Sequence, residues 1–163
     1  MTTPETEPFR LLFVCTGNTC RSPLAEVIAR RLVSERGWNH VEIGSAGVAA
    51  FDGAPASGGS VRTAEANGLD LSRHASKALA ARTLSDADLI LTMSASHLFR
   101  VFEMGAGDRA AVITSFAAGE EGEDVGGVPD PIGGPDEEYA ETYRVLERLI
   151  EASLARLEPV LSP

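Results

Sequence analysis

The chain has 163 residues, of which 44% are apolar, 23% charged and only 6% aromatic. This length and composition are typical of one globular domain that is large enough to bury a substantial core. The 14 Lys and Arg residues against 24 Asp and Glu residues give a formal net charge of −10. We therefore expect neither nucleic acid nor a membrane surface as a partner, because both favour an excess of positive charge.

The first residues of the chain are polar and acidic, whereas a signal peptide begins with basic residues that precede an apolar run. No segment approaches the roughly 20 apolar residues that a membrane-spanning helix needs. We interpret residues 1–8 as a flexible leader and residues 9–158 as a single domain, and we expect a cytoplasmic protein.

Cysteine is rare in this sequence: Cys15 and Cys20 are the only two. Two cysteines five positions apart form neither the disulfide framework of a secreted protein nor a four-ligand zinc site. We expect no metal and no other cofactor, and we look for the role of these thiols in local chemistry.

The first third of the chain predicts a strand, a turn and a helix. Residues 9–15 are almost continuously apolar, as in a strand that is buried on both faces of a parallel sheet. Ser22 and Pro23 resemble the N-cap and first residue of a helix whose apolar pattern stops at Gly37. Residues 40–43 alternate as a second, short strand.

The middle of the chain predicts a loop followed by more strands and helices. Residues 45–59 are rich in Gly, Ala, Pro and Ser and indicate a loop, and residues 61–67 indicate a short helix. Residues 88–93 form another buried strand pattern, which is followed by a helix that ends before Gly105. We expect a fourth strand at residues 111–116.

Residues 118–135 are rich in Gly and Pro and predict a surface loop that is long enough to suggest a function. A last helix is expected over residues 135–157, with its apolar face formed by Tyr139, Tyr143, Leu146, Leu149 or Ile150, and Leu154. Strands that alternate with helices predict an α/β fold with a four-stranded parallel sheet and helices on both faces, similar to flavodoxin.

The turn after the first strand reads CTGNTCRS, with Cys15 and Arg21 six positions apart. This turn is the usual phosphate site of such sheets, because free amides and the helix dipole meet there. It has neither the glycine spacing of a dinucleotide fingerprint nor the Gly-Lys pair of a Walker loop. The spacing allows the loop amides and the Arg21 guanidinium to surround a phosphoryl group above the Cys15 sulfur. The same positive groups favour the nucleophilic thiolate of Cys15.

This loop and the following Pro23-Leu24-Ala25-Glu26 resemble the low-molecular-weight protein tyrosine phosphatase family. The resemblance covers nearly the whole chain and includes Ser45-Ala46-Gly47 after the second strand and Asp130-Pro131 in the long loop. It implies hydrolysis of a phosphomonoester or phosphoramidate through a cysteinyl-phosphate, without a metal.

The resemblance also implies a role for individual residues. Cys15 is expected to be the nucleophile, Arg21 the phosphate ligand, and Asp130 the acid and then the base. The remaining phosphate-binding positions are expected at Thr16, Gly17, Asn18, Thr19, Cys20 and Ser22, with Ser45 and His74 behind them. Ser22 would donate a hydrogen bond to the Cys15 sulfur, and Asn18 would hold the shape of the loop.

Thr19 makes the loop resemble that of the bacterial protein arginine phosphatases, because tyrosine-specific members usually carry a larger aliphatic residue there. Ile132 follows Asp130-Pro131, where tyrosine-directed members carry aromatic residues. Ala49 and Ile132 also stand where the arginine-directed proteins commonly have an aromatic residue, and Phe51 is the candidate to replace it. We expect a phosphoarginine protein substrate, with phosphotyrosine as the alternative and small phosphoesters as a third class.

Other interpretations remain open. Arsenate reductases share this fold and loop but need further cysteines, which this sequence lacks, and a module that only binds phosphate needs neither Cys15 nor Asp130. Cys20 is either a small buried residue or a partner for a protective disulfide with Cys15. Tyr139 and Tyr143 are expected to serve packing, and His97 shows no partner pattern. We expect a monomer.

Overall fold

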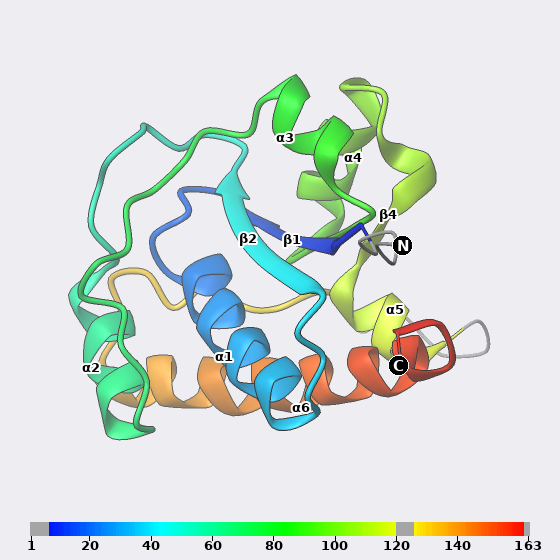
Figure 1. Ribbon diagram of the computed structural model, residues 1–163. Coiled ribbons are helices and arrows are strands. Elements are labelled where there is room, and N and C mark those ends of the chain that lie inside the picture. Colours follow the sequence, from blue (N-terminus) through cyan, green and yellow to red (C-terminus); the bar gives the residue numbers. More distant parts are fainter. Residues whose placement is uncertain (1–6, 120–125, 162–163) are drawn as a thin grey trace.

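The computed structural model describes residues 7–119 and 126–161. Within them, four strands form one parallel sheet in the order β2-β1-β3-β4 (Figure 1). The strands are β1 (Phe9–Cys15), β2 (Val41–Gly47), β3 (Leu89–Thr92) and β4 (Ala110–Val112). The predicted α/β fold with a four-stranded parallel sheet is therefore confirmed.

Helices cover both faces of this sheet (Figure 1). They are α1 (Arg21–Glu35), α2 (Gly58–Ala66), α3 (Ala81–Asp86), α4 (Ala95–Glu103), a 3-10 turn η1 (Gly107–Arg109), α5 (Ile113–Ala118) and α6 (Asp136–Leu161). Leu11 and Phe13 of β1 face the core formed with α1 and α6, while Leu12 and Val14 face the core formed with α3 and α4. This alternation explains why nearly every residue of β1 is apolar.

Helix α6 is the longest element and lies along α1 (Figure 1). Its first turn carries three acidic residues, which the positive end of the helix dipole stabilises. The predicted apolar face is confirmed, because its buried side chains include Tyr139, Tyr143, Leu146, Ile150 and Leu154. The helix continues to Leu161, beyond the predicted end near residue 157.

Several predicted boundaries are wrong. Strand β2 continues to Gly47, so that Ser45-Ala46-Gly47, predicted as a loop, pairs with Phe13, Val14 and Cys15 of β1. Small residues lack the apolar alternation that marks a strand, but here they fit the closely packed end of the ladder.

Helix α1 begins at Arg21 with Cys20 at its N-cap, so Ser22 is not the cap. Ser22 points to the Cys15 sulfur instead. The fourth strand covers only residues 110–112, because Ile113 already begins α5.

Smaller differences concern the remaining elements. Helix α2 begins three residues earlier than predicted, at Gly58, where the Ser57 hydroxyl accepts from the Ser60 amide. Strand β3 is one residue shorter at each end than predicted, and α3 is an additional six-residue helix. The predicted leader lies mostly outside the described residues and stays a prediction. No helix in the described part of the chain is long and apolar enough to cross a membrane.

Candidate active site

The loop of residues 15–21 connects β1 to α1 at the carboxyl end of the sheet. Asn18 in its middle has a φ of 56°, a left-handed conformation that is unusual for a residue with a side chain. The Asn18 side chain is buried and fully engaged. Its Nδ2 donates to Ser22 Oγ at 2.8 Å and to Ser45 Oγ at 2.9 Å, and its Oδ1 accepts from the Lys77 amide at 2.9 Å. His74 Nε2 lies 2.7 Å from the Asn18 carbonyl oxygen, so surrounding elements hold the strained residue in place.

Cys15 ends β1 and is buried. Its sulfur lies 2.9 Å from the hydroxyl of Ser22, which belongs to the first turn of α1. The Cys15 carbonyl accepts from the Val48 amide and the Thr16 carbonyl from the Ala49 amide, which ties the loop to the segment after β2. The structure thus places the predicted nucleophile within hydrogen-bond distance of a hydroxyl group and in a backbone that is hydrogen-bonded to the segment after β2.

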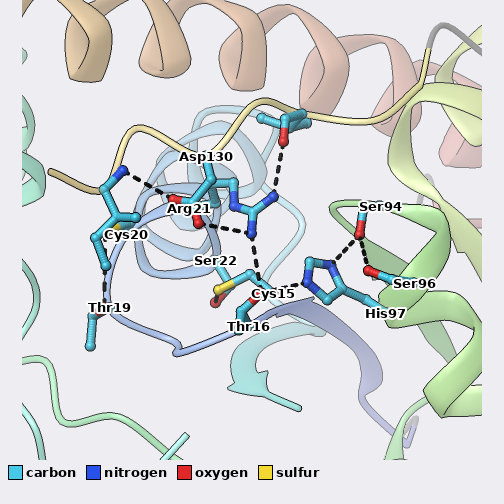
Figure 2. A network of polar contacts seen from close by, with 12 residues as sticks. Cys15, Thr16, Thr19, Cys20, Arg21, Ser22, Ser94, Ser96, His97 and Asp130 are labelled. Atoms are coloured by element: carbon cyan, nitrogen blue, oxygen red, sulfur yellow. Dashed lines mark hydrogen bonds and ion pairs between the residues drawn. The ribbon is translucent and has the colours of Figure 1, made fainter. Parts of the chain in front are cut away.

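Arg21 connects the loop to the segment that carries Asp130 (Figure 2). Its Nη1 donates to the Val128 carbonyl at 2.9 Å, and its Nη2 lies 3.4 Å from Thr16 Oγ1 and 3.5 Å from Asp130 Oδ2. Arg21 is buried, whereas 39% of the Asp130 side chain is exposed. Asp130 Oδ1 also accepts from the Ile132 amide, so the carboxylate is held beside Arg21 while part of it remains exposed to solvent.

Thr19 and Cys20 form the other side of the loop. The Thr19 hydroxyl lies next to Gly17, where an added Cβ would be 3.6 Å from it. The Cys20 thiol donates to Ser57 Oγ at 3.2 Å and lies 3.7 Å from the Tyr139 hydroxyl. Both cysteines are free thiols, and Cys20 is the small buried residue that one interpretation expected.

Sequence reasoning missed His97. This buried side chain of α4 has its Nε2 2.9 Å from Thr16 Oγ1 and its Nδ1 3.0 Å from Ser94 Oγ (Figure 2). Burial, together with the positive charge of Arg21, lowers the pKa of His97 to about 4. Its position in the first turn after β3 was the available signal, because the carboxyl ends of parallel strands meet at such a site.

The structure therefore brings the predicted residues into one site, with Ser45 and His74 against the back of the loop. In the described ranges, no group of three or more His, Cys, Asp or Glu side chains is placed to hold a metal ion.

A model of the low molecular weight phosphotyrosine protein phosphatases matches residues 10–160. The chain belongs to this family. It is therefore a low-molecular-weight protein phosphatase, as the loop motif indicated.

Similar proteins include enzymes with two different substrates in their names. A protein-arginine-phosphatase from Geobacillus stearothermophilus is 34% identical over 93% of this chain and 97% of its own length. The low-molecular-weight protein-tyrosine-phosphatase Wzb from Escherichia coli is 34% identical over 85% of this chain and 88% of its own length. The crystal structure of a low-molecular-weight protein tyrosine phosphatase from T. tengcongensis is 39% identical, covers 91% of this chain and 99% of its own chain, and superposes with a TM-score of 0.84.

Proposed function

We propose that this phosphatase hydrolyses phosphoarginine in proteins through a cysteinyl-phosphate intermediate. The observation that carries the mechanism is the arrangement of three groups around one loop. The Cys15 sulfur lies 2.9 Å from the Ser22 hydroxyl, Arg21 follows at the end of the loop, and the Asp130 carboxylate lies 3.5 Å from the Arg21 guanidinium.

In the first step, the Cys15 thiolate attacks phosphorus, an S–P bond forms, and the P–N bond to the substrate guanidino group breaks. Loop amides and Arg21 bind the phosphoryl oxygens, whose charge they stabilise. Asp130 carries a proton and transfers it to the departing nitrogen. The partial exposure of Asp130 supports this role, because a leaving group departs towards solvent.

In the second step, a water molecule attacks the same phosphorus and the S–P bond breaks. Asp130, now a carboxylate, accepts the proton of that water, and inorganic phosphate is released. The Ser22 hydroxyl stabilises the departing Cys15 thiolate by donating a hydrogen bond to it. The cycle returns the enzyme to its starting state without a cofactor.

Thr19 supports phosphoarginine as the substrate. Its small polar side chain is partly exposed, with its hydroxyl beside Gly17, where a larger aliphatic residue would present an apolar surface. Ile132, the residue after Asp130-Pro131, is 65% exposed and adds no aromatic surface. The similarity to the arginine phosphatase over most of both chains points in the same direction.

Phosphotyrosine is the second candidate, and Wzb favours it with an equal identity over a shorter segment. Phe51 is 86% exposed and belongs to the segment after β2, which is hydrogen-bonded to the loop through Ala49. An aromatic side chain of this kind can pack against a phenol ring.

A comparison of phosphoarginine and phosphotyrosine in the same peptide, without added metal, tests the proposal. We expect a higher kcat/KM for phosphoarginine in the wild type and no turnover by Cys15→Ser. Thr19→Ile is expected to increase the phosphotyrosine to phosphoarginine ratio of kcat/KM by about tenfold or more, since a 1.4 kcal/mol change in transition-state binding has that effect. Thr19→Ser keeps the hydroxyl and is the matched control.

A wild type that prefers phosphotyrosine would overturn the substrate assignment, and an active Cys15→Ser variant would overturn the mechanism. The cytoplasmic location and the monomeric state remain predictions from the sequence.

A further inference from the structure

Glu26 is an acidic residue of α1 that the proposed reaction does not use. Only 12% of its side chain is exposed, and both of its carboxylate oxygens are engaged. Oε1 accepts a hydrogen bond from Ser45 Oγ at 2.6 Å, and Oε2 pairs with Arg30 Nη1 at 2.7 Å. A largely buried carboxylate is costly because it loses its hydration, and its two short contacts compensate that cost only in part.

We propose that Glu26 is a positioning residue for Cys15, and that it acts through a chain of hydrogen bonds with a fixed direction. The chain runs from Glu26 through Ser45, Asn18 and Ser22 to the Cys15 sulfur. The inference rests on the proposed role of Cys15 as the nucleophile.

The direction of the chain follows from the orientation of the Asn18 amide. The Lys77 amide donates to Asn18 Oδ1 at 2.9 Å, so the amide oxygen faces Lys77 and the NH₂ group faces the two serines. An NH₂ group only donates, and both Ser22 Oγ and Ser45 Oγ therefore accept from Asn18.

Each serine hydroxyl must then direct its own single proton away from Asn18. For Ser45, the group on that side is Glu26 Oε1, a carboxylate oxygen that only accepts. For Ser22, the group on that side is the Cys15 sulfur. The result is that the Ser22 proton points at Cys15, the direction needed to stabilise a thiolate.

Glu26 fixes the outer end of this chain. Without an acceptor at this position, the buried Ser45 hydroxyl has an unpaired proton and rotates to find another partner, which weakens its bond to Asn18. Asn18 holds the strained centre of the loop at a φ of 56°, so its displacement also moves Ser22 relative to Cys15.

The outer end of the chain opens onto a polar cavity of about 310 Å³. Its lining includes Glu26, Ser45 and His74 together with the charged residues Arg30, Asp70, Arg73 and Lys77. The Arg30 guanidinium compensates the charge of Glu26 at this outer end, while Asn18, Ser22 and Cys15 at the inner end of the chain are buried.

The test is the pH dependence of Cys15 alkylation by iodoacetamide, measured without substrate. Cys15 and Cys20 lie on one tryptic peptide, so fragment ions must separate them. We expect Glu26→Leu, which has no acceptor, to move the alkylation midpoint to higher pH and to reduce kcat for p-nitrophenyl phosphate about tenfold, the effect of losing one hydrogen bond of about 1.4 kcal/mol.

Two further variants separate the acceptor from the ion pair. Glu26→Gln keeps one oxygen for Ser45 and is expected to restore most of the activity and the wild-type midpoint. Arg30→Met removes the ion pair and leaves the Ser45 contact in place, and we expect it to change kcat less than twofold. Equal losses in Glu26→Gln, Arg30→Met and Glu26→Leu would assign the effect to the ion pair and overturn the proposal.

The combination of Glu26→Leu with Ser45→Ala tests whether Glu26 acts through Ser45. In the Ser45→Ala background the chain is already broken, so Glu26→Leu is expected to cause no further change. Additive losses would contradict the chain. Alkylation needs no substrate, so these outcomes do not depend on whether the proposed substrate is correct. A folded Glu26→Leu variant whose alkylation midpoint equals that of the wild type would refute the role of Glu26 and leave the proposed function unaffected.

Discussion

His97 is buried beside Arg21, and both of its ring nitrogens lie within hydrogen-bond distance of a hydroxyl group. Arg21 only donates, so Thr16 Oγ1 accepts from it and directs its own proton to His97 Nε2. The imidazole is then neutral, with its proton on Nδ1 and facing Ser94 Oγ. Protonation of the ring would place a second positive charge close to Arg21, and the two charges would repel each other.

This environment makes the folding stability depend on pH. The pKa of His97 is about 4 in the folded protein, because burial and Arg21 lower it, although the charge of Asp130 raises it slightly. In the unfolded chain the pKa returns to about 6.5. The unfolded state therefore binds more protons between these values, and the contribution of His97 is complete above about pH 6.5 and is lost as the pH falls towards 4.

We predict that the free energy of unfolding decreases by about 2 to 3 kcal/mol between pH 7 and pH 4.5 through this residue alone. Urea unfolding at both pH values measures it. His97→Gln keeps a polar side chain that does not titrate, and its stability should depend on pH less than that of the wild type by the same amount. An equal decrease in the free energy of unfolding of the wild type and of His97→Gln would show that His97 does not cause it.

At the scale of elements, the end of β2 determines how closely the 15–21 loop can pack. A Cβ added to Gly47 would lie 2.5 Å from the Thr16 carbonyl oxygen and 2.9 Å from the Asn18 amide nitrogen. Both atoms belong to the backbone and cannot move without moving the loop. The glycine is needed here because of this close approach.

We predict that Gly47→Ala weakens inhibition by inorganic phosphate about tenfold or more and lowers the melting temperature. Gly44→Ala is the matched control on the same strand, because its Cβ would meet only the Leu12 side chain at 3.7 Å. Phosphate inhibition constants and thermal unfolding of the two variants check this. Equal behaviour of Gly44→Ala and Gly47→Ala would show that the loop tolerates the displacement.

Gly47 also shows what the sequence can predict about the fold. The apolar run of β1 and the spaced apolar residues of α6 produce strong periodic signals, so these elements were identified. Ser45-Ala46-Gly47 has no such signal, and its strand conformation depends on pairing with β1, a long-range contact. The six residues of α3 are too few for a helical period to be visible.

The residues of the candidate site also fall into those that the sequence predicts and those that only the fold reveals. Cys15, Arg21 and Asp130 were identified from residue types and from a resemblance that includes their order along the chain. His97 and Glu26 became candidates only when the fold placed them beside Thr16 and Ser45, respectively. A histidine in a helix and a glutamate in an amphipathic helix are common, and their surroundings give them a role.

At the scale of the whole molecule, the charge of −10 is unevenly distributed along the chain. Residues 118–163 contain twelve acidic residues and three arginines, whereas residues 1–117 contain twelve acidic residues and eleven Lys or Arg. The acid-rich part includes Asp130 and the first turn of α6. Glu137 and Glu138 in this turn are exposed and lie only seven and eight residues after Asp130 in the sequence. A field of this sign repels other anions but attracts basic peptide segments around a phosphorylated residue.

We predict that lysine residues flanking the phosphorylated residue lower KM relative to glutamate residues, and that 1 M salt removes most of the difference, since the screening length falls from about 10 Å at 0.1 M to about 3 Å. Steady-state kinetics measures this difference in KM, with the flanking residues varied in whichever peptide, phosphoarginine or phosphotyrosine, the enzyme hydrolyses better. Combined Glu137→Gln and Glu138→Gln should reduce the preference. Combined Glu151→Gln and Glu158→Gln removes the same charge from the same helix about 20 Å or more away and should leave the preference unchanged. If both pairs have the same effect, only the net charge matters; if neither has any, the first turn of α6 does not contact or attract the substrate.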